Sequence, residues 1–345
     1  MSATKLPLAD KTVPCSPGAW VRVALAEFAA RDTALAWSSL RENIETAWPD
    51  PLPERLRRLV ADHGLDLRDV LLLAVAGEVE TSHAVDIAIA ELQAPAAAAW
   101  PSVHLCVALV GALFDQPRFT AQHLHDSALV QAGLLELVGD GPLPLRSVRV
   151  HPALWATLAG GAKGWPGTHP LATTGSAPVP AHLAKQLDAL ASAFCAGAIR
   201  GAVLRGQPAS GRGANAAALA QRARRHPVEV PAALWQEQPA LRAAARYANW
   251  LAVVRVDLGP GEVWRAAGAH EPPSPIAIVV GGDGAVQGEG LLEIDVPMLA
   301  CAERRLVWRR TLGEDDPATV ALVDRAAREQ LISAPAIRAV AAHAR

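Results

Sequence analysis

The residues from Ile199 to Arg222 read IRGAVLRGQPASGRGANAAALAQR and indicate how the second half of the chain folds. A short apolar run, Ala202 to Leu204, leads into a loop of Gly, Pro and Ser residues. An alanine-rich segment without Gly or Pro leaves this loop at Ala214. An apolar run, a glycine loop and an alanine-rich segment, in this order, predict a strand, a loop and a helix.

The loop has the glycine spacing of a phosphate-binding P-loop, G-x-x-x-x-G-K-[ST]. Gly206 and Gly211 occupy the two glycine positions, while Arg212 and Gly213 replace the Lys and the Ser or Thr. Backbone N–H groups at a helix N-terminus attract a phosphate, and glycines let the backbone approach it closely. The residues that we expect to contact nucleotide phosphates are Gly206, Ser210, Gly211, Arg212, Gly213 and Ala214.

The two substitutions weaken the chemistry that a P-loop performs. Arg212 keeps the positive charge, but its planar guanidinium is larger than an ammonium group and shaped differently. Gly213 has no hydroxyl to ligate Mg²⁺, and without a placed metal ion the charge on a transferring phosphoryl group is poorly stabilised. We therefore expect a loop that has lost hydrolysis, with ATP or ADP and weakly held Mg²⁺ as its candidate ligands.

Two alternative interpretations of the loop remain open. Gly211 to Ala216 also fits the dinucleotide fingerprint G-x-G-x-x-A, with Glu229 as the acidic residue downstream. The loop after Leu204 is too long for the tight first turn of that motif, so this interpretation ranks well below the P-loop. The other alternative is a surface loop that binds no ligand, and the loop residues alone give it nearly equal weight.

Strands and helices alternate along residues 181–298. The expected strands are Val228–Val230, Trp250–Leu258, Ile276–Val280 and Leu291–Val296. Unbroken apolar runs such as WLAVV and IAIVV are typical of strands buried in a parallel sheet. The sequence therefore predicts an α/β domain, a mostly parallel sheet in an αβα sandwich.

Asp257, at the end of the run WLAVVRVDL, is the candidate metal ligand and catalytic residue. In P-loop enzymes an acidic residue at the end of a second strand holds the metal ion, and an adjacent one polarises water. Here Leu258 follows Asp257, and Glu262 lies beyond a Gly-Pro-Gly turn. Asp283 follows the Ile276–Val280 strand in the place of a phosphate-sensing residue. For both aspartates, a role in capping a turn is an equally good or better interpretation.

Residues 19–160 predict a helical domain that includes a β-hairpin. Two of the expected helices are Val21–Leu40 and Thr120–Gly133. The runs Leu134–Val138 and Leu145–Val150 then flank Gly139-Asp140-Gly141, which is a hairpin pattern. Several helices followed by a hairpin indicate a winged-helix-like domain.

The charge of this domain favours protein docking over DNA binding. Residues 1–160 hold 12 Lys and Arg against 18 Asp and Glu, a net charge of −6. A DNA-binding face needs clustered cations, and Thr120–Gly133 has none. We expect protein partners and no nucleic acid, and a winged-helix DNA-binding regulator is kept as an alternative.

The remaining segments are a polar tail, 1–18, a linker rich in Gly, Pro, Ser and Thr, 161–180, and a helical lid, 299–345. The expected helices of the lid are Ala302–Leu312, Pro317–Leu331 and Ser333–Arg345. Arg304 could reach a phosphate across a subunit boundary, although arginine-rich helices more often form a solvated or docking face.

Composition indicates a cytoplasmic globular protein. The 345 residues carry a net charge of −2, and the four cysteines, which lie far apart, are typical of reduced thiols. No uninterrupted apolar run approaches the ~20 residues of a membrane span, so no membrane association is expected.

Taken together, these residues resemble an AAA+ ATPase, and more closely the ATPases of bacterial extracellular contractile injection systems. The segments that carry the resemblance are LLLAVAGEVE with the helix at Trp100-Pro101-Ser102-Val103, Leu134 to Gly160, AERRLVW, and LISAPAIRAVAAHAR. The resemblance implies a winged-helix-like N-terminal region, a degenerate AAA module with a helical lid, protein partners and a homo-oligomeric ring.

The chain departs from the family pattern in the loop, in the missing carboxylate pair and in the absence of a second AAA module. It is therefore expected to be part of a longer protein or a stand-alone pseudo-ATPase. The resemblance implies an assembly, remodelling or scaffold module for a contractile particle. A weak but active ATPase, in which Arg212 does the work of the lysine, is the alternative, so enzyme activity is left open.

Overall fold

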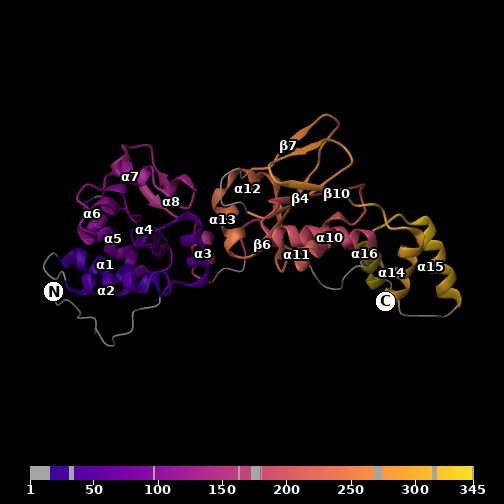
Figure 1. The fold of residues 1–345 in the computed structure, drawn as a ribbon, viewed down its shortest axis with the longest axis horizontal. Coiled ribbons are helices and arrows are strands. Elements are labelled where there is room, and N and C mark those ends of the chain that lie inside the picture. The colour runs from indigo at the N-terminus through magenta and orange to yellow at the C-terminus, as the bar shows by residue number, and fades with distance from the viewer. Residues whose placement is uncertain are drawn as a thin grey trace. The chain divides into compact units, whose positions relative to one another are not determined.

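The computed structural model describes residues 16–30, 35–95, 98–161, 164–171, 179, 181–267, 274–312 and 317–343. Most of the expected tail and much of the expected linker lie outside these residues. The chain divides into two compact units, Met1–Lys163 and Gly164–Arg345 (Figure 1).

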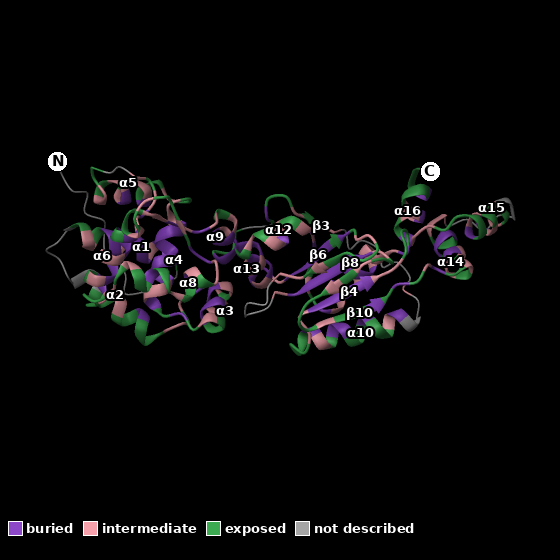
Figure 2. Ribbon diagram, turned by 90° about the horizontal axis from the view of Figure 1, so that it is seen from above, coloured by how far each residue is buried: buried purple, intermediate pink, exposed green. Residues whose placement is uncertain are grey.

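The N-terminal unit is mainly helical. Its helices are α1 (Pro17–Ala30), α2 (Leu35–Thr46), α3 (Glu54–His63), α4 (Leu67–Glu78), α5 (His83–Leu92), α6 (Val103–Leu113), α7 (Ala121–His125), α8 (Ala128–Gln131) and α9 (Pro152–Leu158). Helix α4 is buried along almost its whole length, and α1, α5 and α9 pack against it (Figure 2). The apolar run LLLAVA therefore forms the centre of this unit.

Two helices expected from the sequence are each divided in the structure. The segment Val21–Leu40 belongs to α1 and α2, which pack against each other instead of forming one continuous helix. The segment Thr120–Gly133 contains α7 and α8, because the Ser127 hydroxyl accepts a hydrogen bond from the Val130 N–H and starts a new helix.

The expected hairpin is present as an antiparallel pair of short strands. Strand β1 (Glu136–Val138) pairs with β2 (Ser147–Arg149), and Leu137 lies opposite Val148. A single 3₁₀ turn, η1 (Leu143–Leu145), lies between them. The hairpin packs against α4 and α6 through β2.

The C-terminal unit contains a six-stranded, mostly parallel sheet, as the sequence predicts. The strands, in spatial order, are β10 (Leu291–Asp295), β4 (Gly201–Arg205), β8 (Ile276–Val280), β6 (Trp250–Val256), β5 (His226–Pro231) and β3 (His169–Pro170). The first five are parallel to one another, and β3 pairs with β5 in the antiparallel sense. Strands β4, β8 and β6 are buried over nearly every residue.

Part of the expected linker is built into this unit. Strand β3 comes from that segment, and Trp165 before it is buried. The Trp165 indole Nε1–H donates a hydrogen bond of 3.1 Å to Gln238 Oε1. Glycine- and proline-rich sequence does not by itself exclude such an edge strand.

Helices cover the sheet. On one face α10 (Ala181–Cys195) and α11 (Arg212–Arg222) bury Leu204, Val253 and Val279. The helices α12 (Ala232–Glu237) and α13 (Pro239–Tyr247) pack against β5 and β6. This arrangement of helices and sheet is consistent with an αβα sandwich.

Two smaller elements complete the C-terminal unit. A parallel pair of short strands, β7 (Val263–Arg265) and β9 (Ala285–Gln287), was not expected from the sequence. The helices α14 (Cys301–Leu312), α15 (Pro317–Glu329) and α16 (Ala334–His343) follow β10 and enclose a small core of their own. We call these three helices the lid.

Candidate functional site

The glycine loop, residues 206–211, joins the carboxyl end of β4 to the first residue of α11. Strand β4 lies inside the sheet, between β10 and β8, so the loop lies at the carboxyl edge of the parallel strands. Ligands bind at this edge in open α/β sheets. The predicted order of strand, loop and helix is present, and α11 begins at Arg212, two residues earlier than expected.

Each of the two loop glycines has a local reason to be glycine. Gly211 has a φ of +85°, a backbone conformation that other residues adopt at a cost. A Cβ on Gly206 would stand 2.4 Å from the Val296 carbonyl oxygen, so the loop begins tightly against the chain that leaves β10. A Cβ on Gly211 would stand 3.6 Å from the Cβ of Ser333, which directly precedes α16 of the lid.

Ser210 contributes a buried hydroxyl to the loop. Its side chain is only 4% exposed, and its Oγ has no hydrogen-bond partner among the residues that the structure describes. The Oγ faces across the loop, 2.8 Å from where a Cβ on Gly206 would stand. A buried hydroxyl without a partner carries a desolvation cost of about 1–3 kcal/mol, which a bound ligand could offset.

Arg212, the replacement for the P-loop lysine, folds back onto the sheet. Its guanidinium donates a hydrogen bond to the carbonyl oxygen of Val280, the last residue of β8. Ala214 lies in the first turn of the helix and is partly exposed. The positive charge at the start of α11 is therefore held at the carboxyl edge of the sheet.

Arg255 is a second arginine at the start of α11. Side chains alternate between the two faces of a strand, so Arg255 shares the face of β6 on which Leu251 and Val253 pack under α10 and α11. A Cβ on Gly213 would stand 2.9 Å from a terminal nitrogen of the Arg255 guanidinium. The Arg255 side chain also forms an ion pair with Glu229 of β5, and about half of it, 52%, is exposed.

Arg255 is not among the site residues predicted from the sequence. A signal was present, since one charged residue interrupts the apolar run WLAVVRVDL. Glu229, the acidic residue of the dinucleotide interpretation, is engaged by Arg255.

The charges of Arg255 and Asp257 both act on the Arg212 guanidinium. Partial burial is the first cause of a lowered pKa of the Arg212 guanidinium, and the nearby positive charge of Arg255 is the second. Asp257, which directly follows β6, opposes this shift through its negative charge. The structure thus gathers Arg212, Arg255 and Asp257 beside the glycine loop.

The residues present do not fit a magnesium ion at this loop. Gly213 offers no hydroxyl, and the space beside it holds the Arg255 guanidinium. Within the described part of the chain, no group of three or more His, Cys, Asp and Glu side chains is arranged to hold a metal ion. Two arginines near a single carboxylate also oppose a divalent cation by charge.

The other two acidic residues near the P-loop-like site, Glu262 and Asp283, have local structural roles. The Glu262 carboxylate accepts a hydrogen bond of 2.8 Å from the Gly259 N–H, so it closes the Gly-Pro-Gly turn. The carbonyl oxygen of Asp283 accepts a hydrogen bond of 3.3 Å from Arg205. Arg205 also pairs with Glu293 across the sheet at 2.5 Å.

Arg304 is neither a solvated residue nor free to reach a neighbouring subunit in this structure. Its side chain is buried inside the lid, at 5% exposure. The guanidinium donates a hydrogen bond of 2.9 Å to the Ala327 carbonyl of α15 and another to the Leu299 carbonyl. These bonds make Arg304 part of the interior of the lid.

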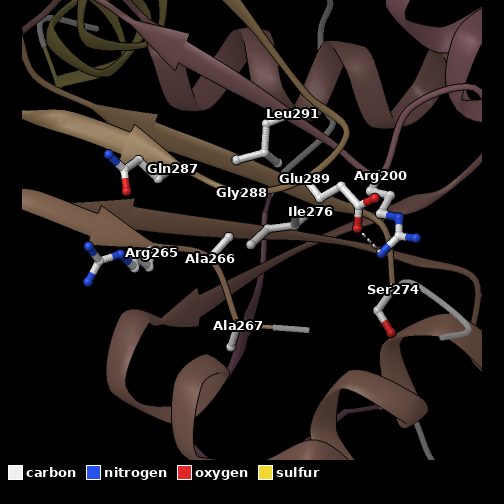
Figure 3. A pocket seen from close by; sticks show the side chains of 10 residues that line it. All are labelled: Arg200, Arg265, Ala266, Ala267, Ser274, Ile276, Gln287, Gly288, Glu289 and Leu291. Atoms are coloured by element: carbon white, nitrogen blue, oxygen red, sulfur yellow. Dashed lines mark ion pairs between the residues drawn. The ribbon is translucent and has the colours of Figure 1, made fainter. Parts of the chain in front are cut away.

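A separate pocket of about 210 Å³ lies at the opposite, amino edge of the sheet. Figure 3 shows Ile276 and Leu291 on its apolar side and the ion pair between Arg200 and Glu289, 3.1 Å apart, on its rim. The pocket lies at the amino ends of β8 and β10, whereas the glycine loop follows the carboxyl end of β4. It is therefore not part of the candidate phosphate site.

Comparison with known proteins gives no family for the chain. No protein-family profile and no curated protein matches it. One similar solved structure is described as an E. coli MS115-1 HORMA:CdnC:Trip13 complex, with 10% sequence identity and a TM-score of 0.26. The alignment covers 48% of this chain and 88% of that one. A similarity this low carries no argument about function, which must be argued from the site itself.

Proposed function

We propose that the C-terminal unit is an AAA-type P-loop module that binds a nucleotide without efficient hydrolysis. The observation that carries the proposal is the glycine loop at the carboxyl end of an interior strand, followed directly by helix α11. Its N–H groups and two arginines supply positive potential where phosphates bind in this class of fold.

The strand order supports the same proposal. Numbered along the chain, the five parallel strands stand in the order 5-1-4-3-2, with β8 between the loop strand β4 and the Asp257 strand β6. Doubly wound dinucleotide-binding sheets have the order 3-2-1-4-5-6, and flavodoxin-like sheets have the order 2-1-3-4-5. The order therefore favours the P-loop over the dinucleotide interpretation.

The chemistry of the loop favours binding over turnover. A transferring phosphoryl group needs a positioned metal ion and a polarised water. Gly213 cannot ligate the metal ion, Leu258 takes the place of the second carboxylate, and Glu262 is engaged in its own turn. We infer a nucleotide-stabilised scaffold or assembly module, with the acidic N-terminal unit docking protein partners. The contractile injection system is the proposed setting, on the sequence resemblance.

The experiment that tests this function compares two glycine variants in the full chain. Gly211→Leu adds a side chain inside the phosphate loop at φ +85°, whereas Gly197→Leu adds one at φ +68° with open space around it. Both should lose similar stability, about 1–2 kcal/mol. Equilibrium dialysis with ATP and ADP should show binding abolished in Gly211→Leu alone. Equal nucleotide affinity in both variants would remove the site assignment.

A further inference from the structure

Arg255 fills the space beside position 213, where a P-loop has its hydroxyl side chain. Its terminal nitrogen lies 2.9 Å from the position that a Cβ on Gly213 would occupy. A Ser or Thr at position 213 would require Arg255 to move. The glycine and the arginine therefore fit each other as a pair, in place of a hydroxyl and a metal ion.

Three independent features at this point favour an anion. The N-terminus of α11, an eleven-residue helix, attracts negative charge. The Ser210 hydroxyl is buried in the loop and has no hydrogen-bond partner within the described residues. Two guanidinium groups, those of Arg212 and Arg255, lie close enough to oppose each other's charge. Like charges held together are stabilised when an anion lies between them.

We propose that Arg255 and Arg212 form a metal-independent clamp for the diphosphate group of the nucleotide, in which the Arg255 guanidinium takes the place of Mg²⁺. This inference rests on the proposed function, because it concerns the same loop. An arginine can serve here because its planar fork can donate two parallel hydrogen bonds to phosphate oxygens.

Glu229 positions the Arg255 side chain before any ligand binds. The ion pair between them holds the guanidinium beside Gly213, and 31% of the Glu229 side chain is exposed. The Glu229 carboxylate accepts a hydrogen bond from the Arg255 Nε, and its negative charge opposes a phosphate at the terminal nitrogens. Glu229 therefore orients Arg255 and, at the same time, weakens anion binding.

The test is calorimetric titration of the full chain with ATP, and separately with inorganic pyrophosphate, in EDTA and in Mg²⁺. The wild type should bind both ligands in EDTA. Arg255→Gln should weaken both by about tenfold or more, the size of one good charged contact. The affinities of Arg255→Lys should lie between those of the wild type and of Arg255→Gln, because lysine keeps the positive charge but lacks the planar guanidinium. Unfolding temperatures of all variants check that each one is folded.

Matched variants separate the clamp from a general effect of charge. Arg265→Gln removes one positive charge from an exposed side chain of β7 and should leave both affinities unchanged. Glu229→Gln should tighten binding by up to about fivefold, because an exposed ion pair no longer competes. Unchanged or weaker binding in Glu229→Gln would contradict the role given to Glu229.

The possible failures of this proposal and of the proposed function differ. Wild-type affinity in Arg255→Gln, or binding that requires Mg²⁺, would overturn the clamp and leave nucleotide binding intact. Binding of ATP without binding of pyrophosphate would overturn the diphosphate assignment. No binding of any ligand by the wild type, with or without Mg²⁺, would overturn the proposed function itself.

Discussion

At the residue scale, Asp257 distinguishes a metal site from an anion clamp. A carboxylate that holds Mg²⁺ increases nucleotide affinity, whereas a carboxylate beside two arginines decreases it by repelling the phosphates. The negative charge of Asp257 acts on Arg212, whose pKa it raises against the opposing effect of Arg255. Whether the Asp257 carboxylate raises or lowers the affinity for nucleotide therefore distinguishes a metal site from an anion clamp.

Asp257→Asn should tighten the binding of ATP in EDTA, by roughly two- to tenfold, up to about 1.4 kcal/mol. The reason is that one repulsive charge is removed while both guanidinium groups stay. Calorimetric titration measures the change, and the same chain should release no phosphate at a steady rate. Weaker binding in this variant, or phosphate release that disappears with it, would favour a weak but active ATPase instead.

Arg304 shows how far a residue type can mislead when only the sequence is known. Its helix carries Arg304, Arg305, Arg309 and Arg310, which is the pattern of a solvated face. The structure nevertheless buries Arg304, and backbone carbonyls satisfy its donors. Whether an arginine finds such acceptors depends on how three helices pack, which the sequence pattern does not specify.

At the scale of elements, Arg304→Met should loosen the lid. The variant leaves the Ala327 and Leu299 carbonyls without their charged donor, at a cost of about 1.5–3 kcal/mol. Hydrogen exchange should speed up in α14 and α15 and stay unchanged in α4 of the other unit. Arg309→Met, at an exposed position of α14, is the control. Equal exchange rates in the two variants would mean that the buried bonds do not hold the lid together.

The start of α4 should show a pH-dependent stability. Asp66 and Asp69 form a capping box, and burial, followed by the charge of Asp66, raises the pKa of Asp69 to about 6 from an ordinary value of 3.8. The folded state thus holds its proton more tightly than the unfolded state. The stability that this tighter proton binding contributes to the folded state is fully present below pH 3.8. It is lost as the pH rises through about 6.

Asp69→Asn removes this titration and keeps a side-chain oxygen that can accept the bond from the Asp66 N–H. Relative to the wild type, the variant should be more stable at pH 7.5 than at pH 4.5, because the buried charge is gone. Urea unfolding at both pH values measures the difference. Removal of an exposed carboxylate, Glu80→Gln, is the control. A variant whose relative stability does not change with pH would contradict the assignment.

The elements that could be predicted from the sequence are those with a strong local pattern. The runs IAIVV and WLAVV form interior parallel strands because only apolar side chains fit between two covered faces. Strands β7 and β9 could not be predicted, because each is only three residues long and largely exposed and so has no apolar pattern. For the site, glycine spacing located the loop, but Arg255 comes near it only through the pairing of β6 with β5 and β8.

At the scale of the whole molecule, the proposed nucleotide site and the proposed docking unit belong to different parts of the chain. All residues of the candidate phosphate site lie in Gly164–Arg345, and the acidic excess lies in the N-terminal unit. Among the described residues, no helix is long and apolar enough to cross a bilayer.

Nucleotide should promote self-association if the chain forms the ring that the resemblance implies. Mass photometry of the full chain with and without ATP should show a shift to closed oligomers, which Gly211→Leu prevents and Gly197→Leu does not. The same oligomeric state with and without ATP would contradict a nucleotide-stabilised ring. It would not contradict nucleotide binding at the glycine loop.

The most direct test of the central claim is calorimetric titration of the purified full chain with ATP, first in Mg²⁺ and then in EDTA. We expect saturable binding at one site per chain, with an affinity that survives removal of the metal ion. Absence of heat, together with an unchanged unfolding temperature, would mean that the glycine loop is only a structural connection between β4 and α11.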